Sequence, residues 1–203
     1  YSILLSLFTA FTGVMLPRMS SLLAEGKKEE FKILLHRSVN ILMMFCTPLV
    51  YFSVLFAPQI IAMLSGKGYE GAIIPMRIVM PLMMIIGYEQ ILVIQTLMPL
   101  KKDKIILVNS IIGALCGLFL NFMIVPAMEG IGSSIVWFIS ECAVLISAQV
   151  FVTKYTGIKF PARQILNNIV YYIPMLLLLF PIYLYIENIF LSIVFCGIMM
   201  LLY

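Results

Sequence analysis

The stretch that decides the fold is residues 101–130, KKDKIILVNSIIGALCGLFLNFMIVPAMEG. Charged residues fill its first four positions, and residues 105–125 then carry no charge and are mostly apolar as far as Pro126. A helix of about 20 apolar residues is long enough to cross the hydrocarbon core of a bilayer. The stretch therefore predicts a membrane-spanning helix that Pro126 ends, followed by a second apolar run from Gly130.

The rest of the chain is also rich in apolar residues and poor in charged ones. Of its 203 residues, 63% are hydrophobic and 11% are charged, whereas soluble domains are about 45–50% apolar and about 25% charged. This composition excludes a soluble globular domain and a disordered chain. The apolar runs show no strict alternation, which argues against the strands of a membrane barrel. We therefore expect an all-α fold, a polytopic transmembrane helical bundle.

Apolar runs divide the chain into seven expected spans. Each run is apolar on all sides, as is typical of helices in lipid or in a bundle core. The chain begins and ends inside such a run, so we expect it to be a piece of a longer protein. Glu187 and Asn188 are expected to form the turn before the last span. The expected spans are residues 1–16, 38–65, 71–100, 105–125, 130–153, 165–186 and 189–203.

Lysine and arginine gather in alternate connections. Eleven of the thirteen lie in the segments 18–37, 101–104 and 154–164. The other two are Lys67, in a turn, and Arg77, within a span. Such a bias places the three basic segments in the cytoplasm. Because the basic residues follow topology instead of forming one patch, and the net charge is only +4, nucleic acid is not an expected partner.

The segment 18–37 is expected to be a cytoplasmic connection that is partly helical. Pro17 and Arg18 should end the first span, and Gly26 should interrupt the connection. Two roles stay open for this segment: a hinge or lipid-surface anchor, or a plain connector with solvated charges. Prolines inside the spans are expected to kink their helices, and these are Pro48, Pro75, Pro81, Pro174 and Pro181.

No arrangement of residues typical of an enzyme is visible. The single histidine, His36, and the single aspartate, Asp103, stand beside basic residues. The four cysteines are dispersed through apolar runs without the spacing of metal ligands. We expect no catalytic residue, no metal and no cofactor, and the chain is not expected to be an enzyme.

Ionisable residues inside the spans are the candidates for function. Glu89 and Glu141 each lie about ten residues from the end of a span, which places them roughly 15 Å deep, and Arg77 is roughly 9 Å deep. A lone carboxylate there is costly, so a polar cavity or a proton-coupling site is predicted. The alternative is a neutral side chain that hydrogen-bonds a neighbouring helix. Arg77 could bind an anionic phosphate or extend to the outer surface.

Four segments of the chain resemble one family of membrane proteins, in that family's order. They are VMLPRMSSLLAEGKKEEFKILLHRSVN (14–40), LFAPQIIAMLSGKGYEGAIIPMRIVMP (55–81), LMPLKKDKIILVNSIIGALCGLFLNFMIVP (97–126) and GIGSSIVWFISECAVLISAQVF (130–151). Together they resemble the C-terminal half of Wzx-type polysaccharide flippases, in the multidrug/oligosaccharidyl-lipid/polysaccharide exporter superfamily. The likeness covers about residues 1–165 and is diffuse.

The resemblance implies the C-terminal lobe of a MATE-like two-lobe transporter, with residues 1–154 as a six-helix lobe incomplete at its start and 155–203 as two additional helices. It implies translocation of undecaprenyl-diphosphate-linked oligosaccharide by alternating access, for O-antigen or capsule biosynthesis, in the bacterial cytoplasmic membrane. Implied partners are that lipid-linked substrate, membrane lipid, the N-terminal lobe of the same protein and a polysaccharide polymerase. Arg18 and Arg77 become candidates for the anionic headgroup, and Glu89 and Glu141 for the lobe seam or for ion coupling.

Three other functions stay open at this point. A drug/cation antiporter of the same superfamily and a peptidoglycan-precursor flippase share the expected fold. A membrane protein that transports nothing, either a polytopic transferase or an assembly scaffold, belongs to another class. The lack of an interfacial Asp/His motif argues against the transferase.

Overall fold

A computed structural model describes residues 2–66, 68–185 and 191 of the chain. Within these residues the chain forms helices and no strands, which confirms the expected all-α bundle. Five helical segments are long and apolar enough to cross a bilayer, and they give the chain the character of a multi-pass membrane protein. The expected turn at Glu187 and Asn188 and the last expected span lie outside the described residues.

The bundle begins with a helical hairpin made of α1 (Ser2–Ala24) and α2 (Lys28–Leu55). Its turn contains Gly26, whose φ of +73° suits a residue without a Cβ. The amide N–H of Lys27 donates to the carbonyl of Leu22 at 2.9 Å and closes the end of α1. Gly26 therefore interrupts the helix as expected, but the connection is much shorter than residues 18–37.

The expectation that Pro17 ends the first span is wrong, because α1 continues through Pro17 to Ala24. Met19 and Leu22 are fully buried in the main core cluster, so packing holds the turns after the proline in line. Phe31 and Leu35 of α2 are also buried in that cluster. The segment 18–37 is thus two core-packed helix ends joined by a short turn with exposed charges, which agrees with a connector with solvated charges and not with a separate surface anchor.

A proline decides where α2 ends. The chain breaks at Phe56 and restarts as α3 (Ala57–Ser65), where a single span over 38–65 was expected. Pro58 has no N–H to donate to the carbonyl of Val54, so α2 cannot continue past it unbroken. Phe56 is fully buried and stacks on Phe52 with ring centroids 5.2 Å apart, which fixes the corner.

The next span is a rod with two irregularities. It begins with the 3₁₀ turn η1 (Glu70–Ala72) and continues as α4 (Ile73–Val79), α5 (Leu82–Leu92) and the π-helical turn η2 (Val93–Leu97). The change from α4 to α5 falls at Met80 and Pro81, which agrees with the kink expected at Pro81. The chain then turns at residues 98–102 into α6.

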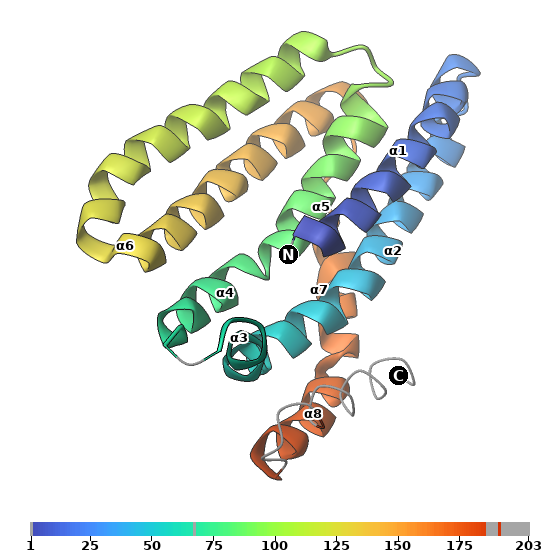
Figure 1. The fold of residues 1–203 in the computed structure, drawn as a ribbon. Coiled ribbons are helices and arrows are strands. Elements are labelled where there is room, and N and C mark those ends of the chain that lie inside the picture. The colour runs from blue at the N-terminus through green and yellow to red at the C-terminus, as the bar shows by residue number, and fades with distance from the viewer. Residues whose placement is uncertain (1, 67, 186–190, 192–203) are drawn as a thin grey trace.

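The helix α6 (Asp103–Thr156) is a hairpin of two antiparallel arms (Figure 1). The helix continues through Pro126, where the sequence predicted its end, and the reversal is at Glu129, with φ +46° and ψ −124°, directly before the second run expected from Gly130. The arms meet at Gly113 and Gly117, because a Cβ on Gly113 would overlap the Val144 side chain and one on Gly117 would come 3.2 Å from Ser140 Oγ. Two glycines four residues apart therefore set the distance between the arms.

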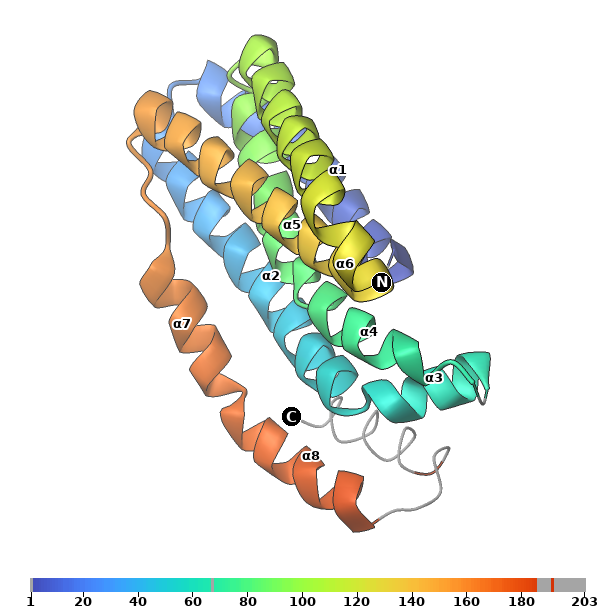
Figure 2. The ribbon, with the colours of Figure 1, turned by 90° about the vertical axis from the view of Figure 1, so that its left-hand side faces the viewer.

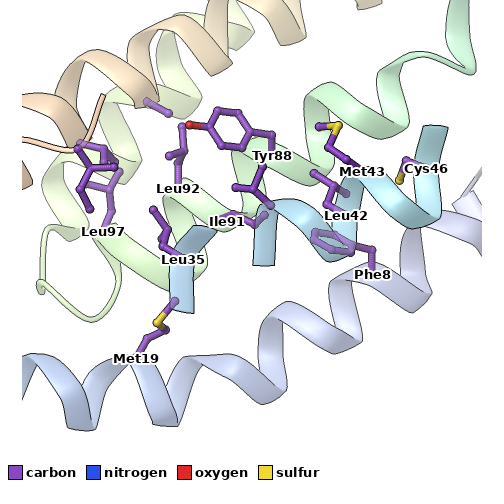
Figure 3. Close-up of a cluster of buried hydrophobic side chains, with 14 of the residues drawn as sticks. Phe8, Met19, Leu35, Leu42, Met43, Cys46, Tyr88, Ile91, Leu92 and Leu97 are labelled. Carbon is purple, nitrogen blue, oxygen red and sulfur yellow. The ribbon is translucent and has the colours of Figure 1, made fainter. Parts of the chain in front are cut away.

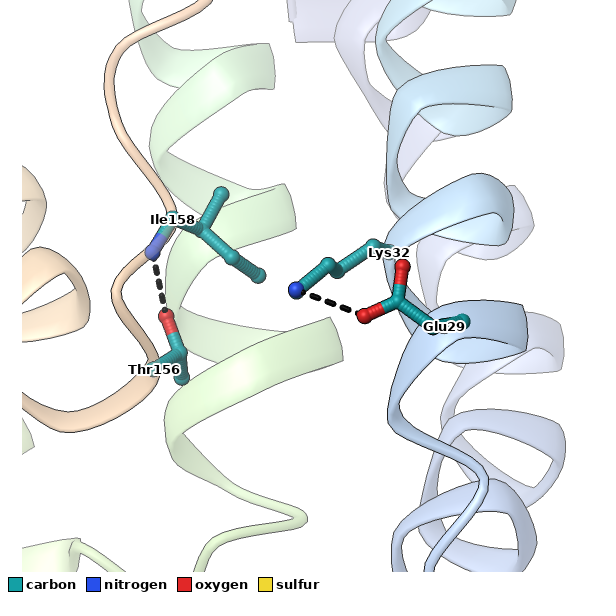
Figure 4. A network of polar contacts seen from close by, with 4 residues as sticks. All are labelled: Glu29, Lys32, Thr156 and Ile158. Atoms are coloured by element: carbon teal, nitrogen blue, oxygen red, sulfur yellow. Dashed lines mark hydrogen bonds and ion pairs between the residues drawn. The ribbon is translucent and has the colours of Figure 1, made fainter.

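The last described helices are α7 (Ala162–Tyr171) and α8 (Ile173–Tyr185), with a break at Tyr172 in place of one straight span over 165–186. They lie along the side of α2 (Figure 2). Before them, Gly157 ends α6 in a left-handed conformation with φ +74°. The N–H of Ile158 donates to Thr156 Oγ1 at 3.1 Å, next to the Glu29–Lys32 ion pair of α2 (Figure 4).

The main core lies between α1, α2, α5 and η2 (Figure 3). Leu42 of α2 contacts α5 at Gly87, where there is no room for a larger residue. In contrast, the first arm of α6 is largely exposed in the isolated fold, on a face of apolar side chains. This face contains Leu107, Val108, Ile111, Leu115, Leu118, Phe119, Phe122 and Met123.

The glycine contact between the α6 arms gives a first test. Gly113→Val should lower the free energy of unfolding by about 1–3 kcal/mol, because the new side chain must displace Val144. Gly13→Val is the matched control, since nothing lies within 4 Å of a Cβ at Gly13 in α1. Thermal unfolding of the detergent-purified protein measures both variants, and adding Val144→Ala to Gly113→Val should recover part of the loss. Equal unfolding of the two glycine variants would contradict the packing described here.

Candidate functional site

Residues 87–90 of α5, GYEQ, contact four different helical segments. Gly87 packs on α2, and Gln90 exchanges hydrogen bonds with Thr9 of α1 at 3.0 and 3.2 Å. Tyr88 bonds the second arm of α6, and Glu89 bonds its first arm. Since successive helical residues point about 100° apart, this short polar run joins α5 to neighbours on every side.

Glu89 belongs to a polar chain between α5 and α6. Asn109 Nδ2, on the first arm, donates to Glu89 Oε1 at 3.4 Å. Ser147 Oγ, on the second arm, donates to Asn109 Oδ1. Asn109 is 2% exposed and Glu89 is half-buried. One carboxyl, one amide and one hydroxyl thus connect three helical segments of the bundle.

Glu141 lies near the middle of the second arm and is also half-buried. Its Oε1 accepts a hydrogen bond from Trp137 Nε1, one turn earlier, at 3.0 Å. Glu89 and Glu141 are close enough to interact electrostatically. The two glutamates that the sequence singled out therefore lie within electrostatic range of each other, each with a hydrogen-bond partner of its own, and we name Glu89, Asn109, Glu141 and Ser147 the carboxyl seam.

The carboxyl seam has no cation of its own. In the part of the chain that the structure describes, the two ion pairs are Glu25–Lys27 and Glu29–Lys32, both at the end of the bundle near the α1–α2 turn. A carboxyl group inside an apolar bundle is costly unless it is neutral, hydrated or bound to a cation. The seam can therefore take up a proton or a cation, or accept hydrogen bonds from a hydroxyl-rich ligand.

The two arginines of the predicted site lie elsewhere. Arg18 is exposed near the α1–α2 turn, where it interacts electrostatically with Glu25 and Lys27. The pKa of Glu25 is lowered mainly by Lys27, whose ammonium donates a hydrogen bond to the Glu25 carboxylate. Arg77 contacts the opposite end of α2, on the order of 30 Å away along the helix. The four predicted residues thus form no single cavity.

Arg77 has a structural partner that the sequence did not reveal. Its Nε donates to the backbone carbonyl of Val54 at 3.1 Å. This is the carbonyl that Pro58 leaves without an N–H donor, and a cation at the end of a helix also complements its dipole. The contact places the Arg77 side chain at a helix end, where it is exposed, which agrees with the surface interpretation and not with a cavity.

A second polar cluster was missed by sequence reasoning. Tyr88 Oη donates to Gln149 Oε1 at 2.6 Å, and Gln149 Nε2 donates to the carbonyl of Ile158 at 3.1 Å. Thr153 Oγ1 donates to the same carbonyl at 2.9 Å. The cluster holds the loop after α6 against α5. Gln149 and Thr153 are one turn apart and give the one sequence signal that could have indicated it.

Nothing in the described ranges suggests a metal centre, since no three His, Cys, Asp or Glu side chains converge within them. Comparisons with protein-family models, curated proteins and solved structures give no match to this chain.

The contact between Arg77 and Val54 predicts a specific double-variant result. Arg77→Met should destabilise the protein by about 0.5–1.5 kcal/mol, because it removes the hydrogen bond that the Val54 carbonyl accepts. Pro58→Ala restores an N–H that can bond the same carbonyl, so Arg77→Met should cost much less in that background. Thermal unfolding of the wild type, both single variants and the double variant measures this coupling. Additive effects would show that Arg77 does not replace the missing donor.

Proposed function

We propose that this chain is part of a multi-pass membrane transporter that moves a lipid-linked oligosaccharide across the bilayer. The observation that carries the proposal is the carboxyl seam, where Glu89 and Glu141 lie half-buried and without a cation between long apolar helices. Ionisable groups in such a place commonly mark the path of a polar substrate or ion. The family resemblance gives the chemical class of the substrate, an undecaprenyl-diphosphate-linked oligosaccharide.

The seam suits the saccharide part of such a substrate. Carboxylate and amide oxygens accept hydrogen bonds from sugar hydroxyls, and the amide N–H groups of Asn109 can donate to them. The exposed apolar face on the first arm of α6 suits contact with a lipid tail or with a second lobe. Since Arg18 and Arg77 lie far from the seam, the diphosphate is not assigned to the same residues as the sugar.

The breaks between helices fit a protein that changes shape during transport. The segments meet at Phe56, at Pro81 and at Tyr172 in short joints, with rigid helices on either side. Joints of this kind allow packed helices to tilt relative to one another without unfolding. The proposed mechanism is alternating access between this MATE-like lobe and a second one, in the bacterial cytoplasmic membrane with the basic segments inside.

One observation also favours a second candidate, a drug/cation antiporter of the same superfamily. Two neighbouring carboxyl groups without a cationic partner could bind an organic cation in exchange for protons. The same substitutions separate the two candidates, because loss of efflux of a cationic dye without loss of surface polysaccharide would favour the antiporter.

The test removes each carboxylate while keeping its shape. We expect Glu89→Gln and Glu141→Gln, made in the full-length protein in its host, to lower surface polysaccharide at least about tenfold at unchanged protein level. A tenfold loss corresponds to about 1.4 kcal/mol, which is similar to the contribution of one hydrogen bond to a charged group. Glu30→Gln is the matched control, since Glu30 is exposed at the start of α2. Surface polysaccharide is quantified by immunoblotting of whole cells and protein level by blotting of membranes. Normal polysaccharide in both seam variants would refute the proposal.

A further inference from the structure

A groove runs along the outside of the bundle between α2 and α7. Its central hollow, of about 550 Å³, is lined by His36, Asn40, Arg163 and their neighbours. It shares His36 with a second hollow toward Lys32 and Lys159. It shares Asn40 with a third hollow toward Met44 and Tyr171. The three hollows are therefore parts of one continuous groove.

Hydrogen bonds between α2 and α7 make the floor of the groove. Gln164 Nε2 donates to the carbonyl of His36 and to Asn40 Oδ1, both at 2.7 Å. Gln164 Oε1 must then accept, so the 2.9 Å contact with His36 Nδ1 is a hydrogen bond that the imidazole donates. Asn168 Nδ2 adds a bond to Asn40 Oδ1 at 3.3 Å. These bonds fix the position of α7 on α2 and keep the groove in shape.

The chemistry of the groove changes from one end to the other. Lys159 and Arg163 are exposed at the end near the loop after α6, and neither is in an ion pair within the described residues. Amide groups line the middle. At the far end, the side chains of Met44 and Tyr171 are 60% and 63% exposed. A ligand that fits has a negative head, a polar centre and an apolar tail.

We propose that this groove binds an anionic phospholipid of the surrounding bilayer. Its phosphate lies between Lys159 and Arg163, its glycerol backbone lies over the amides of Asn40 and Asn168, and an acyl chain follows Met44 and Tyr171. Charge complementarity favours this occupant, because basic side chains at a membrane surface attract anionic lipids. The proposal concerns a lipid that holds α7 on the bundle, and it stands independently of the transport proposed above.

A lipid also explains the length of the groove. The basic end lies at the start of the candidate membrane span Ala162–Pro181, beside the loop after α6, and the far end extends along α2 and α7 into the candidate spans. A soluble phosphate compound would use the basic end alone and leave Met44 and Tyr171 unoccupied. Phosphatidylcholine has the same phosphate and tails without a net charge, so it should bind more weakly.

The experiment titrates phosphatidylglycerol into the full-length protein purified in detergent and records the rise in Tm. Lys159→Gln combined with Arg163→Gln should weaken the apparent affinity about tenfold or more, since each basic side chain near a membrane surface attracts anionic lipid. Lys104→Gln combined with Lys154→Gln removes the same charge from exposed residues outside the groove and should leave the affinity unchanged. If the first pair lowers Tm without lipid, the single charge reversal Lys159→Glu repeats the test.

Further ligands distinguish the sources of the phosphate. Phosphatidylcholine should raise Tm less than phosphatidylglycerol, and glycerol 1-phosphate should leave it unchanged. Equal affinity for phosphatidylglycerol in the wild type and in the groove variants would overturn the proposal. Protection by glycerol 1-phosphate equal to that by the lipid would also overturn it, because the occupant would then be a soluble phosphate compound.

Discussion

Backbone hydrogen bonding at the helix breaks is the constraint on which the rest of this structure depends. In lipid, a carbonyl without a donor costs several kcal/mol, so each break needs a donor from another part of the chain. Arg77 serves the carbonyl that Pro58 leaves free at Val54. Gln149 and Thr153 serve the carbonyl of Ile158 after α6. Some of the polar residues of this apolar chain therefore complete the backbone hydrogen bonding at places where the chain changes direction.

The carboxyl seam is different, because no helix break requires it. Glu89, Asn109 and Ser147 are in continuous helical segments, and the two arms of α6 already pack through Gly113 and Gly117. Apolar residues at these positions would satisfy the fold without burying a charge. Because the architecture does not need this costly group, we attribute it to the transport function proposed above. The two kinds of buried polar residue, those that complete the backbone and those of the seam, can thus be told apart by their contacts.

The sequence was sufficient for the architecture at low resolution. Length and apolarity predict the long helices, and Gly26 and the change at Pro81 agree with the structure. Helix ends were predicted less well, because a proline stops a helix only where packing does not hold the next turn. Pro17 is followed by the buried Met19 and Leu22, so α1 continues, whereas no residue of α3 after Pro58 is buried, so α2 ends.

The candidate site was predicted in part for a related reason. Glu89 and Glu141 are recognisable because carboxyl groups are rare in such helices, and in the structure they lie within electrostatic range of each other. Their partners Asn109 and Ser147 could not be assigned from spacing, because the contact depends on how α6 folds back on itself at Glu129. Arg77 was placed with the glutamates only by its depth along the chain, and depth does not say which neighbour a long side chain reaches.

Reactivity of engineered cysteines toward a charged, water-soluble thiol reagent tests the central claim most directly, in a cysteine-free background reconstituted in lipid. Without surrounding lipid, the side chain of Leu118 is 58% exposed, while that of Glu141 is half-buried. If the bundle spans a membrane around a polar seam, a cysteine at position 141 should react much faster than one at 118, which lipid would cover. Faster reaction at 118 would mean that the apolar face of α6 meets water and would contradict the account.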